Sequence, residues 1–328
     1  MKAAWFEQFG PAAEVLQIGE QPTPKPDAGD VLVRLAASGV NPSDVKKRAG
    51  SFPSLLDDGL VIPHSDGAGV IEAVGEGVPE SRIGERVWLY QAQYVRRFGT
   101  AAEYVAIDDS RAAALPENTS FEVGACLGIP AMTAHRCVFA DGAVDGQTIL
   151  VTGGAGRVGH YAIQWAKQAG ARVITTACQA EDIESCIEAG ADATVNHREP
   201  DWAADVIDKN GGKPVDRVID VEFGANLPQL LKLIRTGGTI ATYSSMQVSE
   251  PKLPFFQMMY LDLTVRFVIV YAMPEEAKQQ AIADINARLA TDNLKHRVAH
   301  TVPFTDIARA HELIESGGFR GCVVVTPV

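Results

Sequence analysis

The chain has 328 residues, of which 46% are apolar and 21% are charged, and its formal net charge at pH 7 is −12. This length predicts two domains, and the composition is that of a globular protein rather than a disordered one. The acidic balance argues against a nucleic-acid partner, because a phosphate backbone needs a basic protein face. A local basic pocket for a small anionic cofactor stays compatible with this balance.

The sequence holds five cysteines, an odd number, and no C-x-x-C pair. This pattern favours free thiols in a reducing compartment over a disulfide framework or a clustered zinc site. The first residues, MKAAWFEQFG, lack the apolar run of a signal peptide. The longest apolar stretch, 265–273, is interrupted by Arg266 and is too short to span a bilayer. We therefore expect a cytoplasmic enzyme with no membrane segment.

The first part of the chain is predicted to be rich in strands. Short apolar runs are separated there by Gly, Pro and Asp residues. These runs lie at 31–40, 69–75, 86–90 and 101–107. Their short length and irregular spacing are typical of a partly open barrel.

Beyond the first 124 residues, apolar strands alternate with amphipathic helices, which predicts an α/β domain with a doubly wound parallel sheet. The expected strands lie at 147–152, 172–177, 215–221, 238–243 and 263–270. The expected helices lie at 156–169 and 180–189, with Gly190 as a C-terminal stop, and later at 275–291 and 306–316. The run GCVVVTPV predicts a final strand.

A glycine-rich loop joins the strand 148–152 to the helix that follows it. Gly154, Gly156 and Gly159 form the pattern G-x-G-x-x-G, and a second strand follows the helix. We expect Gly154 to permit a tight turn, Gly156 a close approach to a pyrophosphate, and Gly159 helix–strand packing. The helix N-terminus then points N–H groups at the phosphates. The alternative is a glycine-rich turn without a ligand, which the register of strand, loop and helix disfavours.

The end of the second strand distinguishes the two nicotinamide dinucleotides. NAD enzymes place Asp or Glu there to bind the ribose 2′-hydroxyl, but residues 177–179 of this chain contain no acid. The missing acid favours NADPH, whose 2′-phosphate can be bound by His197 and Arg198 at the end of the third strand. The alternative is that Arg198 is a solvated loop residue.

Further stretches in both parts of the chain match a known family in order and spacing. They are GVNPSDVKKRAG (39–50), SDGAGVIEAVGEGV (65–78), GTAAEYV (99–105), GIPAMTAHR (128–136), NHRE (196–199) and ESGGFRGCVVV (315–325). Together with the phosphate loop, they resemble the zeta-crystallin-like quinone oxidoreductase branch of the medium-chain dehydrogenase/reductase superfamily. The resemblance implies a GroES-like catalytic domain at 1–124 and 272–328, a Rossmann domain at 125–271, and an active site in the cleft between them.

The resemblance also bears on metal binding. Zinc-dependent members of the superfamily carry Cys in place of Asn41, a His–Glu pair in place of Ser65 and Asp66, and Cys in place of Ile129. Zinc needs thiolate, imidazole or carboxylate donors, which Asn, Ser and Ile do not supply, so a metal-free site is implied. The four-cysteine lobe of the zinc enzymes is absent as well. A replacement ligand at His64 is the alternative, although this residue has no second donor nearby in the sequence.

Individual roles follow from the same resemblance. Asn41 and Ser65 should lie across the nicotinamide, and Thr133 should hydrogen-bond the cofactor near its amide. Lys46 is either a proton or anion handle or a solvated charge, and a turn or helix-start role is the alternative for Asn41 and Thr133. The residues expected to bind the cofactor are Thr133, Gly153, Gly154, Ala155, Gly156, Arg157, Val158, Gly159, Cys178, His197, Arg198, Tyr243, Phe267 and Val268.

Without zinc, alcohol oxidation loses its Lewis acid, whereas reduction of an electrophilic acceptor remains feasible. We therefore expect NADPH-dependent hydride transfer to a quinone or a related carbonyl. Relatives often carry Tyr in place of Lys46 and Phe52, and Lys in place of Asp182, which leaves the acceptor and the strength of the NADPH preference open. The alternatives are an alkenal or enone double-bond reductase on the same scaffold, and a non-catalytic dinucleotide-binding protein.

A homodimer is expected as well. The apolar strand 263–270 comes late in the Rossmann domain and has an edge to protect. Pairing two such edges across a two-fold axis extends the sheet and removes that liability. The resemblance also implies dimers or tetramers.

Overall fold

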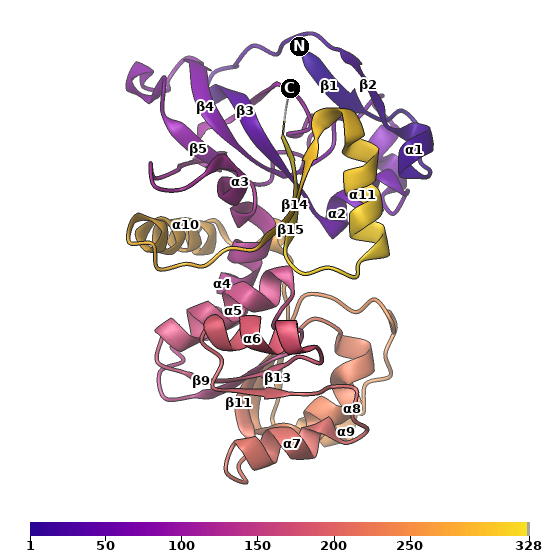
Figure 1. The fold of residues 1–328 in the computed structure, drawn as a ribbon, viewed down its shortest axis with the longest axis vertical. Coiled ribbons are helices and arrows are strands. Elements are labelled where there is room, and N and C mark those ends of the chain that lie inside the picture. Colours follow the sequence, from indigo (N-terminus) through magenta and orange to yellow (C-terminus); the bar gives the residue numbers. More distant parts are fainter. Residues whose placement is uncertain (327–328) are drawn as a thin grey trace. The chain divides into compact units, whose positions relative to one another are not determined.

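The computed structural model describes residues 1–326, which divide into two compact units. Unit 1 contains residues 1–129 and those from 282 onward, whereas unit 2 is the continuous segment 130–281. Their helices and strands are labelled in Figure 1. Within residues 1–326, no helix combines the length and the apolar composition needed to cross a bilayer.

Unit 1 is built around a seven-stranded sheet in which strands from both ends of the chain are neighbours. The order is β14-β15-β3-β4-β5-β7, and β6 also pairs with β3. Only the β14–β15 pair is parallel among these. The strands of this unit are β1 (Lys2–Trp5), β2 (Gln17–Glu20), β3 (Asp30–Val40), β4 (Asp66–Val74), β5 (Arg86–Leu89), β6 (Tyr104–Asp108), β7 (Ala112–Ala114), β14 (Val298–Pro303) and β15 (Cys322–Thr326).

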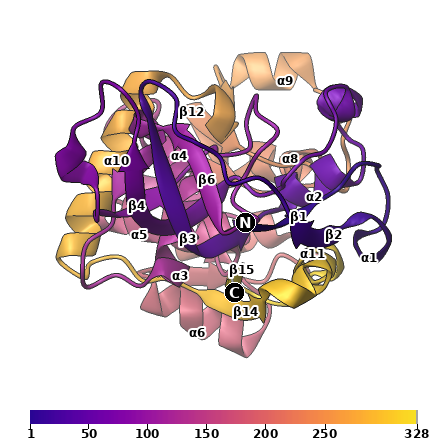
Figure 2. The same ribbon diagram turned by 90° about the horizontal axis from the view of Figure 1, so that it is seen from above.

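Helices lie on the sheet of unit 1 and beside it. They are α1 (Ala12–Val15), α2 (Pro42–Arg48), α3 (Phe121–Gly124) and α11 (Ile307–Ser316). Helix α11 packs beside α1 and α2 (Figure 2) and buries Ile307, Ala310 and His311. These residues recur at positions i, i+3 and i+4, which is the spacing of one helix face. Helix α10 (Glu275–Ala290) spans the division between the units.

Unit 2 contains a six-stranded, fully parallel sheet. Its order is β10-β9-β8-β11-β12-β13. Counted within the unit, this is the order 3-2-1-4-5-6 of dinucleotide-binding sheets. The strands are β8 (Thr148–Val151), β9 (Arg172–Thr176), β10 (Ala193–Val195), β11 (Val215–Asp220), β12 (Ile234–Thr242) and β13 (Thr264–Phe267). The α/β class and the doubly wound sheet expected from the sequence are therefore confirmed.

Helices cover both faces of this parallel sheet. Helices α5 (Arg157–Gln168) and α6 (Ala180–Glu188) lie on one face, and α7 (Trp202–Lys209) and α8 (Phe223–Leu233) lie on the other (Figure 1). The remaining helices of the unit are α4 (Met132–Phe139) and α9 (Phe255–Tyr260). Leu150, Val218 and Ile240 belong to a buried apolar cluster that also contains Trp202 and Phe223. Burial of this strand face against α7 and α8 supplies much of the stability of the unit.

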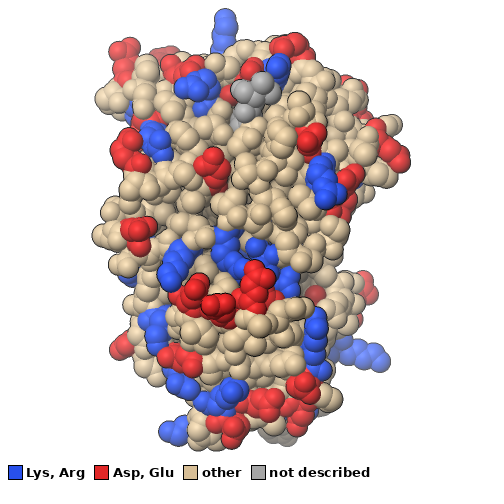
Figure 3. Space-filling model, in the orientation of Figure 1, with Lys and Arg blue, Asp and Glu red and all other residues tan. Residues whose placement is uncertain are grey.

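Two expectations from the sequence pattern need correction. Strand β13 covers only Thr264–Phe267 of the expected 263–270, and a 3₁₀ helix follows at Val270–Ala272. Helix α2, which begins directly after Asn41, was not anticipated. On the face drawn in Figure 3, basic and acidic side chains are intermingled rather than gathered into one basic field.

Candidate functional site

The expected cofactor residues of unit 2 gather at one edge of the parallel sheet, where the strands end. Gly153–Gly159 follow β8, Cys178 follows β9, His197 and Arg198 follow β10, Tyr243 follows β12, and Phe267 and Val268 lie at the end of β13. Ligands of doubly wound sheets bind beyond the carboxyl ends of the strands, where the strand order reverses. This edge is therefore the candidate dinucleotide site.

The strand order reverses between β8 and β11, and hydrogen bonds join the two strands just beyond their ends. Thr152 Oγ1 donates to Asp220 Oδ1 at 2.8 Å and accepts from Val221 N at 3.0 Å. Asn226 Nδ2 donates to the same Asp220 oxygen at 2.8 Å. Burial raises the pKa of Asp220. These bonds hold the two strand ends in register beside the phosphate loop.

The phosphate loop turns at a different glycine from the one expected. Gly153 has a φ of +64° and carries the left-handed turn, whereas Gly154 does not have a positive φ. Gly154 is required for packing instead, because a Cβ there would lie 2.0 Å from Thr175 Oγ1 on β9. Gly153 N also donates to Thr176 Oγ1 at 2.8 Å, so the turn is fastened to the same strand.

The remaining two glycines differ in what surrounds them. A Cβ at Gly159 would lie 2.3 Å from Gly153 O, so the close packing expected of this residue is present. A Cβ at Gly156 would meet only Gly153 O, at 3.1 Å, so this position is nearly open within the chain itself. Gly156 is also the N-cap of α5 and offers no side-chain cap to the N–H groups of the first turn. An open position beside uncapped N–H groups fits a phosphate group.

The ends of β9 and β10 meet through a thiol and an imidazole. Cys178 Sγ lies 3.2 Å from His197 Nδ1. Arg198 follows His197 and is exposed, and its backbone N donates to Asn196 Oδ1 at 3.1 Å. Within residues 1–326, the Arg198 guanidinium has no hydrogen-bond or ion-pair partner. This edge thus carries an imidazole and an unpaired guanidinium but no acid directly after β9.

The other expected cofactor residues of unit 2 differ in their burial and in their contacts. Tyr243 is half-buried as a residue, and burial of its hydroxyl holds its pKa well above the ordinary value. Val268 N donates to the backbone of β12 at 2.7 Å. Phe267 is 69% exposed, and its ring packs edge-to-face on Phe223 at a centroid distance of 5.5 Å. Thr133 is buried in the first turn of α4.

Unit 1 brings Asn41 against a buried acid. Asn41 lies between β3 and α2 as the N-cap of the helix, and its backbone N donates to Asp44 Oδ2 at 2.8 Å. Its side-chain Nδ2 donates to Asp66 Oδ2 at 2.8 Å. Ile129 N donates to the same oxygen at 2.9 Å. Asn41 therefore orients a carboxyl group as well as ending a turn.

Asp66 is fully buried, and its second oxygen has no partner within residues 1–326. Burial, against the hydrogen bonds from Ile129 and Asn41, raises the pKa of Asp66 to about 8. Burial therefore favours the protonated, neutral form of this carboxyl group at neutral pH. Gly128 is required beside it, because a Cβ there would lie 2.2 Å from Asp66 Oδ1. From the sequence, Asp66 was noted only as the counterpart of a zinc-ligand position and was given no role, although an acid at the start of an apolar strand was a visible signal.

The lysine that reaches the predicted site is Lys47 rather than Lys46. Lys46 is exposed on α2, whereas Lys47 is buried, and its Nζ donates to Gln93 O at 2.6 Å. Lys47 Nζ also lies 3.5 Å from Ser65 Oγ. Burial lowers the pKa of Lys47. Because helix α2 was not predicted, its buried face could not be assigned from the sequence.

The donor set of this cluster does not fit a zinc ion. Asn41 presents an N–H to Asp66, and Ile129 contributes a backbone N–H to the same carboxyl group. Zinc requires deprotonated or lone-pair donors in a tetrahedral array. Within residues 1–326, no three His, Cys, Asp or Glu side chains are grouped so that they could hold a metal ion.

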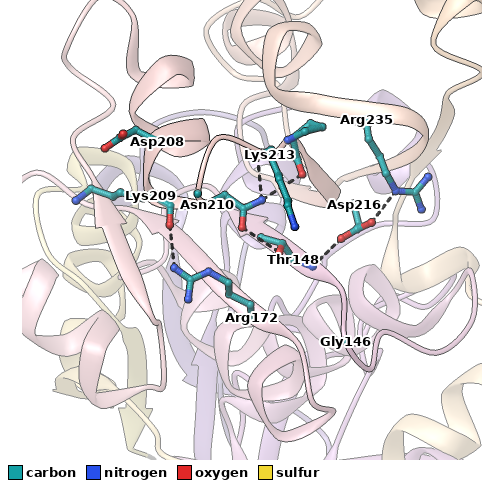
Figure 4. A pocket seen from close by; sticks show the side chains of 11 residues that line it. Gly146, Thr148, Arg172, Asp208, Lys209, Asn210, Lys213, Asp216 and Arg235 are labelled. Carbon is teal, nitrogen blue, oxygen red and sulfur yellow. Dashed lines mark hydrogen bonds and ion pairs between the residues drawn. The ribbon is translucent and has the colours of Figure 1, made fainter.

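A hollow of about 890 Å³ lies at the other edge of the unit 2 sheet, among the amino ends of its strands (Figure 4). Its polar groups hold the protein together. Asp216 accepts from Thr148 N at 2.8 Å and from Arg235 Nε at 2.6 Å, and Arg172 Nη2 donates to Lys209 O at 2.9 Å. Since dinucleotides bind at the carboxyl ends of such strands, this hollow is separate from the candidate site.

Comparison with known proteins places these features in a family. Residues 27–117 match the model of the alcohol dehydrogenase GroES-like domain, and residues 158–287 match that of zinc-binding dehydrogenases. Human quinone oxidoreductase is 31% identical over 99% of this chain and 97% of its own length. The chain belongs to the quinone oxidoreductase branch of the medium-chain dehydrogenase/reductase superfamily.

Two further relatives show the breadth of this superfamily. The structure of Escherichia coli quinone oxidoreductase complexed with NADPH matches with a TM-score of 0.85, 26% identity and coverage of 100% of both chains. An alcohol dehydrogenase of Geobacillus stearothermophilus is 33% identical over 73% of this chain and 76% of its own length. The chain is thus an oxidoreductase of the quinone oxidoreductase type, with a GroES-like domain and a Rossmann-like domain, as the sequence predicted.

Proposed function

We propose that this chain is an NADPH-dependent, zinc-independent oxidoreductase that transfers hydride to a quinone or a related electrophilic carbonyl. The observation that carries the proposal is the Asn41–Asp66 hydrogen bond of 2.8 Å. It fills, with an amide and a buried carboxyl, the place where zinc-dependent members of the superfamily carry metal ligands. An enzyme without this Lewis acid is suited to acceptors that are already electrophilic.

The preference for NADPH rests on the edge of unit 2. No acid follows β9 directly, and Arg198 after β10 is exposed and unpaired within the described residues. A guanidinium matches the geometry of a 2′-phosphate, which NADH lacks. The NADPH complex of the E. coli relative supports the same choice.

When bound, the nicotinamide supplies the hydride. The residues of unit 1 then have an electrostatic task, because negative charge develops on the acceptor oxygen. Asn41 uses one of its two amide protons on Asp66 and can donate the other to that oxygen. The neutral state of Asp66 at pH 7 adds no opposing charge. Lys47 places its Nζ 3.5 Å from Ser65 Oγ.

An acceptor screen tests the proposal. Purified protein is incubated with NADPH, a chelator and either benzoquinones or α,β-unsaturated ketones, and NADPH oxidation is followed at its absorbance maximum. We expect quinone turnover that the chelator leaves intact, and elemental analysis without stoichiometric zinc. Faster reduction of enones than of quinones would favour the double-bond reductase alternative. One tightly held zinc per chain, with loss of activity on chelation, would overturn the proposal.

A homodimer belongs to the same proposal. Strand β13 is the last strand of the unit 2 sheet, and large apolar side chains are exposed on it and on α9. They include Phe255, Phe256, Tyr260 and Phe267, exposed by 67%, 69%, 78% and 69%. Exposed apolar groups beside an open sheet edge favour pairing with a second copy. Light scattering that shows only monomer at micromolar concentration would contradict it.

We also propose that the protein works in a reducing compartment such as the cytoplasm. All five cysteines are free, and Cys126, Cys137, Cys186 and Cys322 are buried. Free thiols fit a reducing environment. Fractionation of the native cells with detection of the protein in the soluble cytoplasmic fraction tests this placement.

A further inference from the structure

A chain of hydrogen bonds crosses the core of unit 1 and ends on the backbone of Asp66. Thr100 Oγ1 donates to Asp66 O at 2.6 Å, and Ser38 Oγ lies 2.7 Å from Thr100 Oγ1. His64 Nδ1 lies 2.8 Å from Ser38 Oγ, and His64 Nε2 lies 2.9 Å from His311 Nε2. All five residues are buried, with side chains at most 1% exposed. We call Ser38, His64, Thr100 and His311 the polar chain.

The carbonyl oxygen of Asp66, at the end of the polar chain, fixes which group donates in each of its hydrogen bonds. A carbonyl oxygen only accepts hydrogen bonds, so the Thr100 hydroxyl donates its one proton to Asp66 O. Ser38 must therefore donate to Thr100, and His64 Nδ1 must donate to Ser38. A neutral His64 then has a bare Nε2, which accepts from His311 Nε2. Burial supports the neutral form, because it lowers the pKa of His64 to about 3.

The polar chain cannot conduct protons to the site, because the carbonyl at its end has no proton to release. Its task is to hold His64. This residue has a φ of +76°, which is an uncommon backbone conformation for a side chain of this kind. His64 directly precedes Ser65 and Asp66, so its conformation sets where these two residues lie. Backbone bonds support the same turn, with Thr100 N donating to His64 O at 3.0 Å.

We propose that His311 is a positioning residue for the reduction, which acts through the His64 tautomer to hold Ser65 and Asp66 in place. The expected effect on kcat rests on the proposed function, whereas the expected histidine tautomers do not. His311 lies on α11, 247 positions from His64 in the sequence. Its N–H is the donor that satisfies His64 Nε2. Without it, His64 Nε2 would be buried and unpaired, or the ring would reverse and break its bond to Ser38.

Two substitutions of His311 distinguish the effect of losing its N–H donor from the effect of losing its ring. His311→Gln keeps an N–H at the tip of the side chain, whereas His311→Leu removes it. We expect His311→Leu to lower kcat about tenfold or more, because an unsatisfied buried acceptor shifts the supported residues. His311→Gln should stay within about threefold of the wild type. The Kd for NADPH should change less than twofold in both variants, because the phosphate loop belongs to the other unit.

A control on the same helix tests whether any loosening of α11 has this effect. Glu315 on α11 forms an ion pair with Arg48 on α2, outside the polar chain. Glu315→Gln removes that ion pair and should leave kcat unchanged. A kcat of His311→Leu equal to that of the wild type, or an equal fall in the Glu315→Gln variant, would overturn the proposal.

Nitrogen-15 spectra of the histidine rings give a readout that needs no substrate and no substitution. The wild-type protein should show His64 protonated on Nδ1 and His311 protonated on Nε2, as neutral rings at pH 7. The opposite tautomer at either ring would overturn the inference. If the wild type shows these tautomers and reduces no acceptor, the proposed function fails while the arrangement of the polar chain stands.

Discussion

Two glycine-to-alanine substitutions in the phosphate loop, at Gly156 and Gly159, distinguish an effect on NADPH affinity from an effect on the free energy of unfolding. Gly156 has φ −72° and ψ 168°, a conformation that any residue adopts, and a Cβ there would meet only Gly153 O at 3.1 Å. Gly156→Ala should therefore change the free energy of unfolding by only about 1 kcal/mol or less, even though alanine is a poorer N-cap. The new methyl group would stand where the pyrophosphate approaches the backbone.

The expected loss in affinity follows from the contacts that this methyl group blocks. A hydrogen bond from a backbone N–H to a charged phosphate contributes about 1.5–3 kcal/mol. Losing one such bond raises the Kd for NADPH by about 10- to 150-fold. Gly156→Val, with a larger side chain, should abolish detectable binding. Titration calorimetry with NADPH and urea unfolding of the same samples measure the two quantities separately.

Gly159→Ala is the matched control, because its methyl group would lie 2.3 Å from Gly153 O. We expect this variant to lose about 1–3 kcal/mol of stability or more from overpacking. The reasoning fails if Gly156→Ala binds NADPH as tightly as the wild type. It also fails if Gly156→Ala is destabilised as much as Gly159→Ala, since Gly156 would then serve the fold.

Arg198→Ala should raise the KM for NADPH about tenfold or more and leave that for NADH unchanged, because only NADPH offers a 2′-phosphate; equal effects on both cofactors would contradict this. Asn41→Ala should lower turnover moderately without weakening NADPH binding, as pre-steady-state kinetics can show. Because burial lowers the pKa of His64 to about 3 and that of His311 well below its usual value, the unfolded chain binds more protons below pH 6.5. These two rings thus lower the stability as the pH falls from 6.5, by about 1.4 kcal/mol per pH unit each, whereas Asp66, with its pKa raised to about 8, acts in the opposite direction. Urea titrations should therefore show that the stability of His311→Gln falls by about 1.4 kcal/mol per pH unit less than that of the wild type.

Local sequence patterns predicted the parts of the structure that depend on neighbours in the chain. The strand, glycine loop and helix around Gly156 lie where expected, because hydrophobic period and glycine spacing are local signals. The left-handed turn at Gly153 instead of Gly154 was missed, since several adjacent glycines all permit it. Lys47 was missed because its burial depends on which face of α2 packs inward, and this short helix was not predicted.

Contacts between distant segments left no trace in any local pattern. Asp66 belongs to the proposed site only because Asn41 and Ile129 are brought to it from other elements. The His64–His311 contact likewise joins residues 247 positions apart. In the sequence, each of these residues is an isolated polar position beside apolar ones. Their pairing depends on how β3, β4 and α11 pack.

The position of β15 has a consequence for how the protein is made. This strand lies between β14 and β3 in the unit 1 sheet, yet it is synthesised after the whole of unit 2. Unit 2 is contiguous, so its whole chain is available once residue 281 has been synthesised. During translation the Ser38–Val40 end of β3, with which β15 pairs, therefore stays unpaired while unit 2 is already able to fold. Truncation of the chain before β15 would leave this part of β3 unpaired and expose a newly made chain to aggregation.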